Sequence, residues 1–383
     1  MLKKRNMKEK SVFIPLPGRW SWLHQLLHDN RGVRYFVAAV AIIIATGLGL
    51  LAMLAQYEDP IINDIPFITK KVVVKKFYSP LTGEEVPDEA ATKRGVTAIM
   101  IENSPDARPQ SGIKQAGVIF EAIAEGGITR FACLYQQSQP GLIGPVRSLR
   151  PYYIDWIAPF AASVAHVGGS YNALQEIRNG SYRDIDQFFN AGAYWRASDR
   201  YAPHNVYTNF ERLNALNDAK GYKESTFTGF LRRDPALKPY QQQQQAKSDA
   251  TLPAAKAIDV SVSSTLYNVR YDYDPTSKTY ARSQGGQSHE DREEGRLTPR
   301  VVIVIKVPMH KAFEDGYREQ MDTIGSGEAF VFQNGTVHVG TWKKDDKKSQ
   351  LRFIDTTTNK DILLEAGQTW ITAIAPERSV SWQ

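Results

Sequence analysis

The sequence predicts an α+β protein built from an N-terminal transmembrane helix, a mixed α/β domain and a mainly β C-terminal domain. Three observations support this prediction. An uncharged apolar segment lies near the N-terminus, strand-like and helix-like segments alternate after it, and short strands dominate the last third of the chain. A length of 383 residues fits two to three domains at roughly 150 residues each.

The uncharged segment, YFVAAVAIIIATGLGLLAMLA at residues 35–55, predicts a membrane anchor. One bilayer crossing needs about 20 residues of helix, and these 21 residues match that length. A cleaved signal peptide has a shorter apolar region, of about 7–15 residues, and a small-x-small cleavage pattern after it. We therefore expect an uncleaved signal-anchor.

The basic leader, residues 1–34, sets the predicted orientation. Its eight basic and two acidic residues leave a net charge of +6. The positive-inside rule then places the leader in the cytoplasm. Residues 56–76 are expected to form a tether, so we predict a single-pass cell-membrane protein whose domains are extracytoplasmic.

Charge and cysteine content exclude several functions. The leader accounts for the whole formal charge of +6, so residues 35–383 are formally neutral and no nucleic-acid partner is predicted. Cys133 is the single cysteine, which excludes an intrachain disulfide and a cysteine-based metal site. His166 and His204, the histidines weighed with a nearby carboxylate as a metal site, are not joined by a short H-x-x-x-H spacing, so neither a metal nor a cofactor is predicted.

The α/β domain is predicted over residues 77–231. GVTAIMIEN, AGVIFEAIA and ITRFACLYQQ predict three strands, the last two joined by a tight turn at Gly126-Gly127. IDWIAPFAASVAHVGGSYNALQEI predicts a helix, a strand and a second helix whose N-cap is Ser170. NFERLNALNDAKGY predicts a helix that ends at Gly221.

Residues 232–257 contain five consecutive glutamines and scattered prolines, which predicts a linker or a long surface loop. The mainly β domain follows over residues 258–383. Its predicted strands lie in IDVSVS, YNVRYDYD, TYARS, RVVIVIKV and, last, GQTWITAIAP. Asn334-Gly335 lies between two alternating runs and predicts a type I′ hairpin turn.

Two arginines beside a predicted helix start have two interpretations. In GPVRSLRPYY, Arg147 and Arg150 precede Pro151, and proline favours the first turn of a helix. Paired guanidiniums there suit a carboxylate or phosphate, because a helix N-terminus already favours anions. The alternative is internal ion pairing, with Glu102, Glu121 or Glu125 as partners.

Further candidates lie where apolar runs end. The turn at residues 168–170 lets the backbone approach an anion closely, although it matches no Walker loop or nucleophile elbow. His166, just before it, is equally explained as a hydrogen-bonded core histidine. Glu102, Arg108 and His204 follow other predicted strands, and ligands of α/β sheets bind at strand ends.

Several long segments resemble one bacterial family. AIMIENSPDARPQSGIKQAGVIFEAIAEGGITRF, IGPVRSLRPYYIDW, AHVGGSYNAL and APHNVYT are similar to the YerB-like lipoproteins, a family built from a domain of unknown function with its own C-terminal companion domain. YDYDPTSKTYARSQGGQSHED, GSGEAFVFQNGTVHVGTW and GQTWITAIAP resemble the companion. The resemblance runs from about residue 78 to the end of the chain. The sequence departs from the family in having an apolar anchor segment in place of an acylated cysteine, and in its glutamine-rich insertion.

The resemblance implies an envelope-facing, membrane-attached protein of two linked domains, and it implies no established activity or cofactor. In the second domain the residues that match the family's motifs are Tyr280, Arg282, His289, Asp291 and Trp342.

The leading hypothesis is a binding module for an anionic cell-envelope ligand or partner. Its predicted ligand-binding residues, which include the family's motif residues of the first domain, are Glu102, Arg108, Glu121, Glu125, Arg130, Arg147, Arg150, His166, Gly168, Gly169, Ser170 and His204. Two alternatives stay open. One is an envelope hydrolase or transferase that uses glutamate and histidine side chains. The other is a scaffold for membrane proteins in which the arginine–glutamate pairs are structural.

Overall fold

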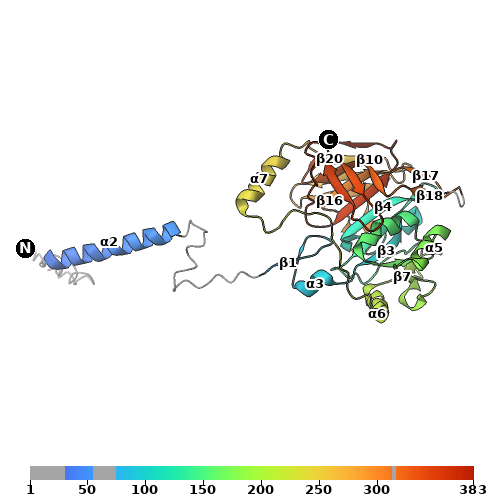
Figure 1. Ribbon diagram of the computed structural model, residues 1–383, viewed down its shortest axis with the longest axis horizontal. Coiled ribbons are helices and arrows are strands. Elements are labelled where there is room, and N and C mark those ends of the chain that lie inside the picture. The colour runs from blue at the N-terminus through green and yellow to red at the C-terminus, as the bar shows by residue number, and fades with distance from the viewer. Residues whose placement is uncertain (1–30, 55–74, 313–315) are drawn as a thin grey trace, which may run out of the picture. The chain divides into compact units, whose positions relative to one another are not determined.

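The computed structural model describes residues 31–54, 75–312 and 316–383. The chain divides into two compact units, Met1–Val74 and Lys75–Gln383. Figure 1 shows the helix of the first unit and the larger second unit.

The predicted anchor segment is helical. Helix α2 spans Arg31–Leu54, and its side chains are exposed over residues 35–49. Within the described ranges, no helix has both the length and the apolar character needed to cross a membrane. The predictions for residues 1–30 and 55–74 lie outside the described residues.

A ten-stranded sheet forms the centre of the second unit. In spatial order its strands are β21 (Arg352–Asp355), β20 (Thr336–Lys344), β19 (Gly325–Gln333), β16 (Val301–Lys306), β22 (Thr369–Ile374), β4 (Val118–Glu125), β5 (Ile128–Tyr135), β3 (Thr97–Glu102), β6 (Ser163–His166) and β7 (Arg183–Asp186). Strand β22 pairs in parallel with β16 on one side and β4 on the other. Strands of the predicted α/β and mainly β regions thus continue one sheet, a junction that was not predicted from the sequence.

A second sheet has five antiparallel strands. Their order is β13 (Gln287–Ser288), β12 (Thr279–Gln284), β11 (Val269–Asp274), β10 (Ala257–Val260) and β23 (Val380–Trp382). Four two-stranded ribbons complete the β-structure: β1 (Phe77–Tyr78) with β2 (Glu85–Val86), β8 (Trp195–Arg196) with β9 (Val206–Tyr207), β14 (Glu290–Asp291) with β15 (Gly295–Arg296), and β17 (Met309–Lys311) with β18 (Glu319–Met321). The predicted last strand is β22, but β23 follows it along the chain.

The helices of the second unit are α3 (Glu89–Lys93), α4 (Pro151–Ile157), α5 (Tyr171–Asn179), α6 (Phe210–Lys220) and α7 (Pro239–Asp249), with short 3₁₀ turns at residues 105–107, 113–115, 158–160 and 191–193. Three predicted boundaries are confirmed. Helix α4 begins at Pro151, Ser170 is the N-cap of α5, and Gly221 ends α6 in the left-handed conformation at φ 75°.

The glutamine-rich segment is not the predicted loop throughout, because residues 239–249 form helix α7. Glutamine is a good helix former, and Pro239 occupies the first turn, where proline is tolerated. Arg233 holds the far end of α7 through two hydrogen bonds, of 2.6 and 2.7 Å, to the carboxylate of Asp249. The composition of this segment therefore did not reveal that part of it forms a helix.

Both predicted glycine turns are confirmed. Gly126 and Gly127, which join β4 to β5, have φ values of 56° and 78°. Asn334 and Gly335, which join β19 to β20, have φ values of 54° and 73°. Positive φ at both central residues is the requirement of a type I′ turn.

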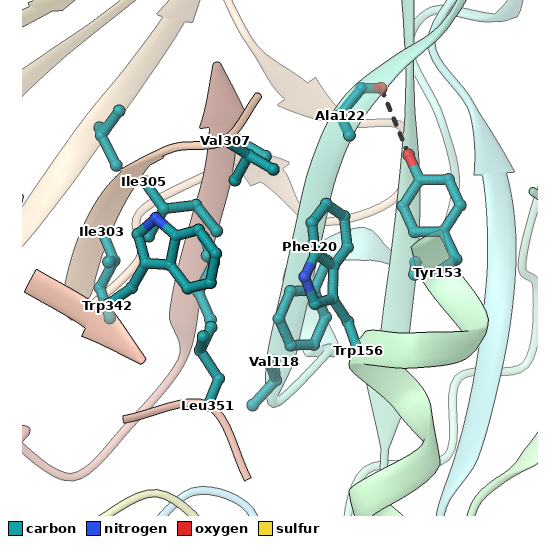
Figure 2. Close-up of a cluster of buried hydrophobic side chains, with 14 of the residues drawn as sticks. Val118, Phe120, Ala122, Tyr153, Trp156, Ile303, Ile305, Val307, Trp342 and Leu351 are labelled. Carbon is teal, nitrogen blue, oxygen red and sulfur yellow. Dashed lines mark hydrogen bonds between the residues drawn. The ribbon is translucent and has the colours of Figure 1, made fainter. Parts of the chain in front are cut away.

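The core lies on both faces of the ten-stranded sheet. On one face, apolar residues of β4 and β16 pack with α4 and α5 in a single cluster. Figure 2 shows Phe120 of β4 against Trp156 of α4, with Ile303, Ile305 and Trp342 nearby. On the other face, the alternate residues of β3, β4 and β5 pack with α6. The two predicted regions therefore share one core as well as one sheet.

Candidate functional site

The arginine pair that stood out in the sequence is bound to carboxylates. Arg150 and Arg130 both donate to Glu125, and the Arg130 hydrogen bond is 2.6 Å long. Arg147 pairs with Glu102, with 3.3 Å between Nε and Oε2. Internal pairing is what the second interpretation of these arginines expected, and it gives Arg147 its own carboxylate while Arg150 shares that of Glu125 with Arg130.

The Glu125 cluster is buried enough to change its titration. Arg130 is 2% exposed at its side chain and Glu125 is 17% exposed. Burial alone would raise the pKa of the Glu125 carboxyl, but the charges and hydrogen bonds of the two arginines bring the pKa below its usual value. The carboxylate therefore stays ionised and ties β4 and β5 to the start of α4.

His166 and the turn after it form a separate cluster. Both ring nitrogens of His166 face oxygen atoms, Nε2 at 3.0 Å from Asp184 Oδ1 and Nδ1 at 2.8 Å from the Gly168 carbonyl oxygen. The Gly168 N–H donates to Asp186 Oδ1 at 3.0 Å, and the Ser170 N–H donates to the Leu149 carbonyl. Two of the turn's donors are thus satisfied within the protein, although the buried Ser170 Oγ has no partner among the described residues.

Glu121 lies in a buried polar network between the two sheets. It accepts hydrogen bonds from Arg282 at 2.8 Å and from Trp370 Nε1 at 2.9 Å, and both ion-pair side chains are fully buried. The Arg282 guanidinium also lies over the Trp370 ring, 4.3 Å from its centroid. This network joins β4, β12 and β22.

His289 extends the network towards the surface. Burial, together with the neighbouring Arg282, holds the pKa of His289 well below its usual value, so the ring is neutral. Its Nδ1 accepts from Arg282, and its Nε2 lies 3.0 Å from Gln110 Oε1. Gln110 in turn donates to Asn103 Oδ1 at 2.9 Å, and Arg108 Nε donates to the same oxygen at 3.1 Å. The network therefore reaches Arg108.

A carboxylate–imidazole pair lies beside Arg108. Glu102, at the end of β3, is 3% exposed, and its Oε1 lies 2.8 Å from Nδ1 of His204. Ser104 Oγ donates to the same carboxylate oxygen at 2.9 Å. Arg147 Nε lies 3.3 Å from the second oxygen, within ion-pair distance but without a hydrogen bond, so His204 and Ser104 supply the hydrogen bonds that orient the Glu102 carboxylate.

His204 lines a pocket of about 660 Å³. The other lining residues come from three separate segments: Asp106, Arg108, Asp199, Arg200, Tyr201, Ala202 and Arg292. Tyr201 is 92% exposed, so the pocket opens to solvent. We call this the arginine pocket.

Two arginines of the arginine pocket are held by backbone carbonyl groups. Arg200 donates to the carbonyl oxygens of Asp106, at 3.0 Å, and Pro109. Arg108 donates to the carbonyl oxygen of Asn103 at 2.9 Å and to that of Leu266 at 3.3 Å. These bonds orient the guanidinium groups without neutralising them.

The charges of the pocket do not balance. Arg292 pairs with Asp199 at 2.6 Å. Among the described residues, neither Arg108 nor Arg200 has a carboxylate within ion-pair distance. Burial lowers the pKa of Arg108 below its usual value; Tyr267 offsets part of this effect, and Arg282 adds to it. Because arginine remains charged at neutral pH, three arginines face two aspartates in the pocket lining, and Arg108 and Arg200 have no ion pair among the described residues.

The predicted site residues fall into separate groups. Three of them meet at the arginine pocket: Arg108 and His204 line it, and Glu102 holds His204. Arg147 adjoins this group through Glu102. The others lie in the three clusters described above: Glu121; Glu125 with Arg130 and Arg150; and His166 with Gly168, Gly169 and Ser170.

Sequence reasoning missed Asp199, Arg200 and Arg292 as pocket residues. The first two precede the APHN segment that contains His204, which was the signal available for them. Arg292 lies in a charged run in which no single residue stands out. Within the described parts of the chain, no cluster of three or more histidine, cysteine, aspartate or glutamate side chains could hold a metal ion.

The fold and the pocket define a class: α+β proteins in which two successive sequence regions build one sheet and a charged pocket is lined by loops of both. The chain belongs to the family described as a protein of unknown function (DUF3048), because the family's N-terminal domain matches residues 81–223 and its C-terminal domain matches residues 258–371. The YerB-like resemblance is thereby confirmed.

One relative and one solved structure agree with this assignment. The "Putative lipoprotein YerB" of Bacillus subtilis (strain 168) is 30% identical over 303 residues, which cover 78% of this chain and 87% of that protein. The crystal structure of the YerB protein from Bacillus subtilis matches with a TM-score of 0.69 and 28% identity, over 80% of this chain and 100% of that one.

Proposed function

We propose that this protein is a membrane-attached, extracytoplasmic binding protein whose anionic envelope ligand binds in the arginine pocket. The observation that carries the proposal is the presence of Arg108 and Arg200 in one cavity with no carboxylate partner among the described residues. A buried or partly buried charge without a partner is unfavourable, and an anionic ligand supplies that partner.

The arginine pocket suits an anionic ligand better than Arg147 and Arg150 do, the two arginines beside the start of α4 from which the sequence predicted an anion site. Arg147 and Arg150 already bind Glu102 and Glu125, so a ligand there would have to displace a protein carboxylate. Arg108 and Arg200 are oriented in advance by carbonyl oxygens, which lowers the entropy lost on binding. A volume of about 660 Å³ lies in the range of small-molecule sites, roughly 300–1,000 Å³.

Calorimetric titration of the full-length protein in detergent with inorganic phosphate, and separately with a dicarboxylate, tests the binding proposal. The double variant Arg108→Gln/Arg200→Gln is expected to weaken binding about 150-fold or more, because each of the two charged hydrogen bonds contributes about 1.5–3 kcal/mol. The matched control Arg270→Gln/Arg352→Gln removes two exposed arginines outside the pocket and is expected to leave the affinity unchanged. Equal affinities for both double variants, or no binding by the natural protein, would contradict the proposal.

Two observations support the proposed membrane attachment, one from the sequence and one from a related protein. Residues 35–55 carry no charge, and a relative covering most of this chain bears the name of a lipoprotein. We expect the protein to stay in the membrane pellet after alkaline extraction and to be cut by protease added outside spheroplasts. A variant lacking residues 1–56 is expected in the soluble fraction. If alkaline extraction released the full chain into the soluble fraction as it does the shortened variant, the proposed attachment would be contradicted.

A further inference from the structure

The Glu102–His204 pair leaves one imidazole nitrogen available on the pocket side. Glu102 is buried and lies within ion-pair distance of Arg147, and its Oε1 lies 2.8 Å from His204 Nδ1. A carboxylate at that distance accepts the Nδ1–H, which leaves a lone pair on Nε2. A base oriented by a third group in this way is the common arrangement of general-base catalysis.

The free nitrogen faces the residues that line the arginine pocket. His204 Nε2 lies 3.9 Å from Asp106 Oδ2, which is beyond hydrogen-bond distance. Arg200 donates to the backbone carbonyl of the same Asp106. The base and the Arg200 guanidinium therefore both lie next to Asp106 in the pocket.

Ser104 is not the nucleophile of this arrangement. Its Oγ lies 3.3 Å from His204 Nδ1, the nitrogen that already faces Glu102, and it donates to Glu102 at 2.9 Å. A nucleophilic serine would have to contact Nε2 instead. Ser104 is also only 7% exposed, so it acts as a positioning residue for the carboxylate. Water entering the pocket is the remaining nucleophile.

The chemistry of the pocket favours a phosphoryl group as the reacting centre. Guanidinium groups bind phosphate oxygens in bidentate fashion, and they stabilise the charge that spreads over these oxygens in phosphoryl transfer. Fixed donors act most strongly when they need no reorganisation, and the carbonyl contacts of Arg108 and Arg200 meet that condition.

We propose that the arginine pocket hydrolyses phosphate esters, with His204 as general base and Glu102 as its positioning residue. In this step Nε2 takes a proton from water while the water oxygen bonds to phosphorus. The bond from phosphorus to the ester oxygen breaks, its electron pair leaves with that oxygen, and the departing oxygen takes a proton from solvent. His204 returns its proton to solvent. This inference rests on the proposed function, because it places the phosphate of the substrate where the anionic ligand binds.

The test uses full-length protein in detergent with bis(4-nitrophenyl) phosphate and 4-nitrophenyl phosphate, and follows release of 4-nitrophenolate. We expect turnover that declines as the pH is lowered, since the base must be unprotonated. His204→Gln is expected to lower kcat by about 100-fold or more. Glu102→Gln is expected to lower kcat and alter its pH profile, which a purely structural role would not do.

The matched control is His338→Gln, which removes another histidine that faces a carboxylate, Asp355 at 3.3 Å, outside the pocket. It is expected to change neither turnover nor binding. Phosphate binding without turnover of either ester would overturn this inference and leave the binding proposal standing. Turnover that His204→Gln does not reduce, in a variant with the natural melting temperature, would also overturn it. Failure to bind phosphate, with no turnover, would overturn both proposals.

Discussion

Replacing Glu121 by glutamine is expected to lower the free energy of unfolding of the second unit by about 3–5 kcal/mol. The side chains of Glu121 and Arg282 are both fully buried, so the variant leaves a guanidinium charge in the interior without its counter-ion. The amide has nearly the shape of the carboxylate and can still accept from Trp370. The loss of unfolding free energy therefore reports the unpaired charge of Arg282 and not the opening of a cavity.

Chemical denaturation followed by tryptophan fluorescence measures this effect. The matched control is Asp259→Asn, which makes the same chemical change in the exposed Asp259–Arg270 pair, whose side chains are 55% and 41% exposed. Exposed pairs contribute about 0–1 kcal/mol, so the control should unfold almost as the natural protein does. Equal stabilities for the two variants would show that the Glu121–Arg282 pair does not hold the two sheets together.

Replacing Phe120 by alanine is expected to cost about 3–5 kcal/mol, the range for aromatic truncation in a core. Phe120 is 1% exposed and stacks on Trp156, with ring centroids 5.6 Å apart and an interplanar angle of 12°. It lies on β4, the strand that pairs directly with β22. Because both regions share this core, the loss should lower the stability of all of the second unit.

Thermal unfolding followed by two probes checks that expectation. Near-ultraviolet and far-ultraviolet circular dichroism should give a single transition that moves to lower temperature in Phe120→Ala. Phe188→Ala removes an exposed ring of the same type, 68% exposed, and is expected to change stability by less than about 0.5 kcal/mol. Two separate transitions, only one of them displaced, would contradict the shared core.

The elements themselves could be predicted because their signals are local. Three of these signals define structure within a few residues. They are the apolar run of β3, the proline at the start of α4 and the Asn334-Gly335 turn. The glutamine-rich segment was misjudged because low apolar content suggested a loop, whereas the helix propensity of glutamine decides its backbone conformation.

The junction of the two regions could not be predicted in the same way. Thr372 of β22 and Glu121 of β4 are 251 residues apart in sequence. Parallel strands buried on both faces are continuous apolar runs, and such a run does not specify its partner. Nothing in GQTWITAIAP distinguishes a strand at the edge from one in the middle of a sheet.

In the candidate site, too, local sequence patterns identified some residues, whereas partners from distant segments could not be predicted. Glu102, Arg108 and His204 were found because polar residues follow apolar runs, and the structure brings all three together. The Arg147 and Arg150 pair attracted attention through its spacing, but its carboxylate partners come from other strands. Arg292 reaches the pocket from the second sequence region, so no local pattern could assign it.

The place of β22 in the sheet affects how the protein is synthesised. This strand, Thr369–Ile374, comes after both of its neighbours along the chain, yet it fills the gap between β16 and β4. A nascent chain that has passed β16 but not yet β22 lacks that strand, so both flanking strands keep an open edge until residues 369–374 have been made. A product shortened by premature termination would retain those open edges, which favour aggregation. Only a chain that includes β22 can close the sheet, and quality-control proteases would therefore be able to distinguish such molecules from those that lack the strand.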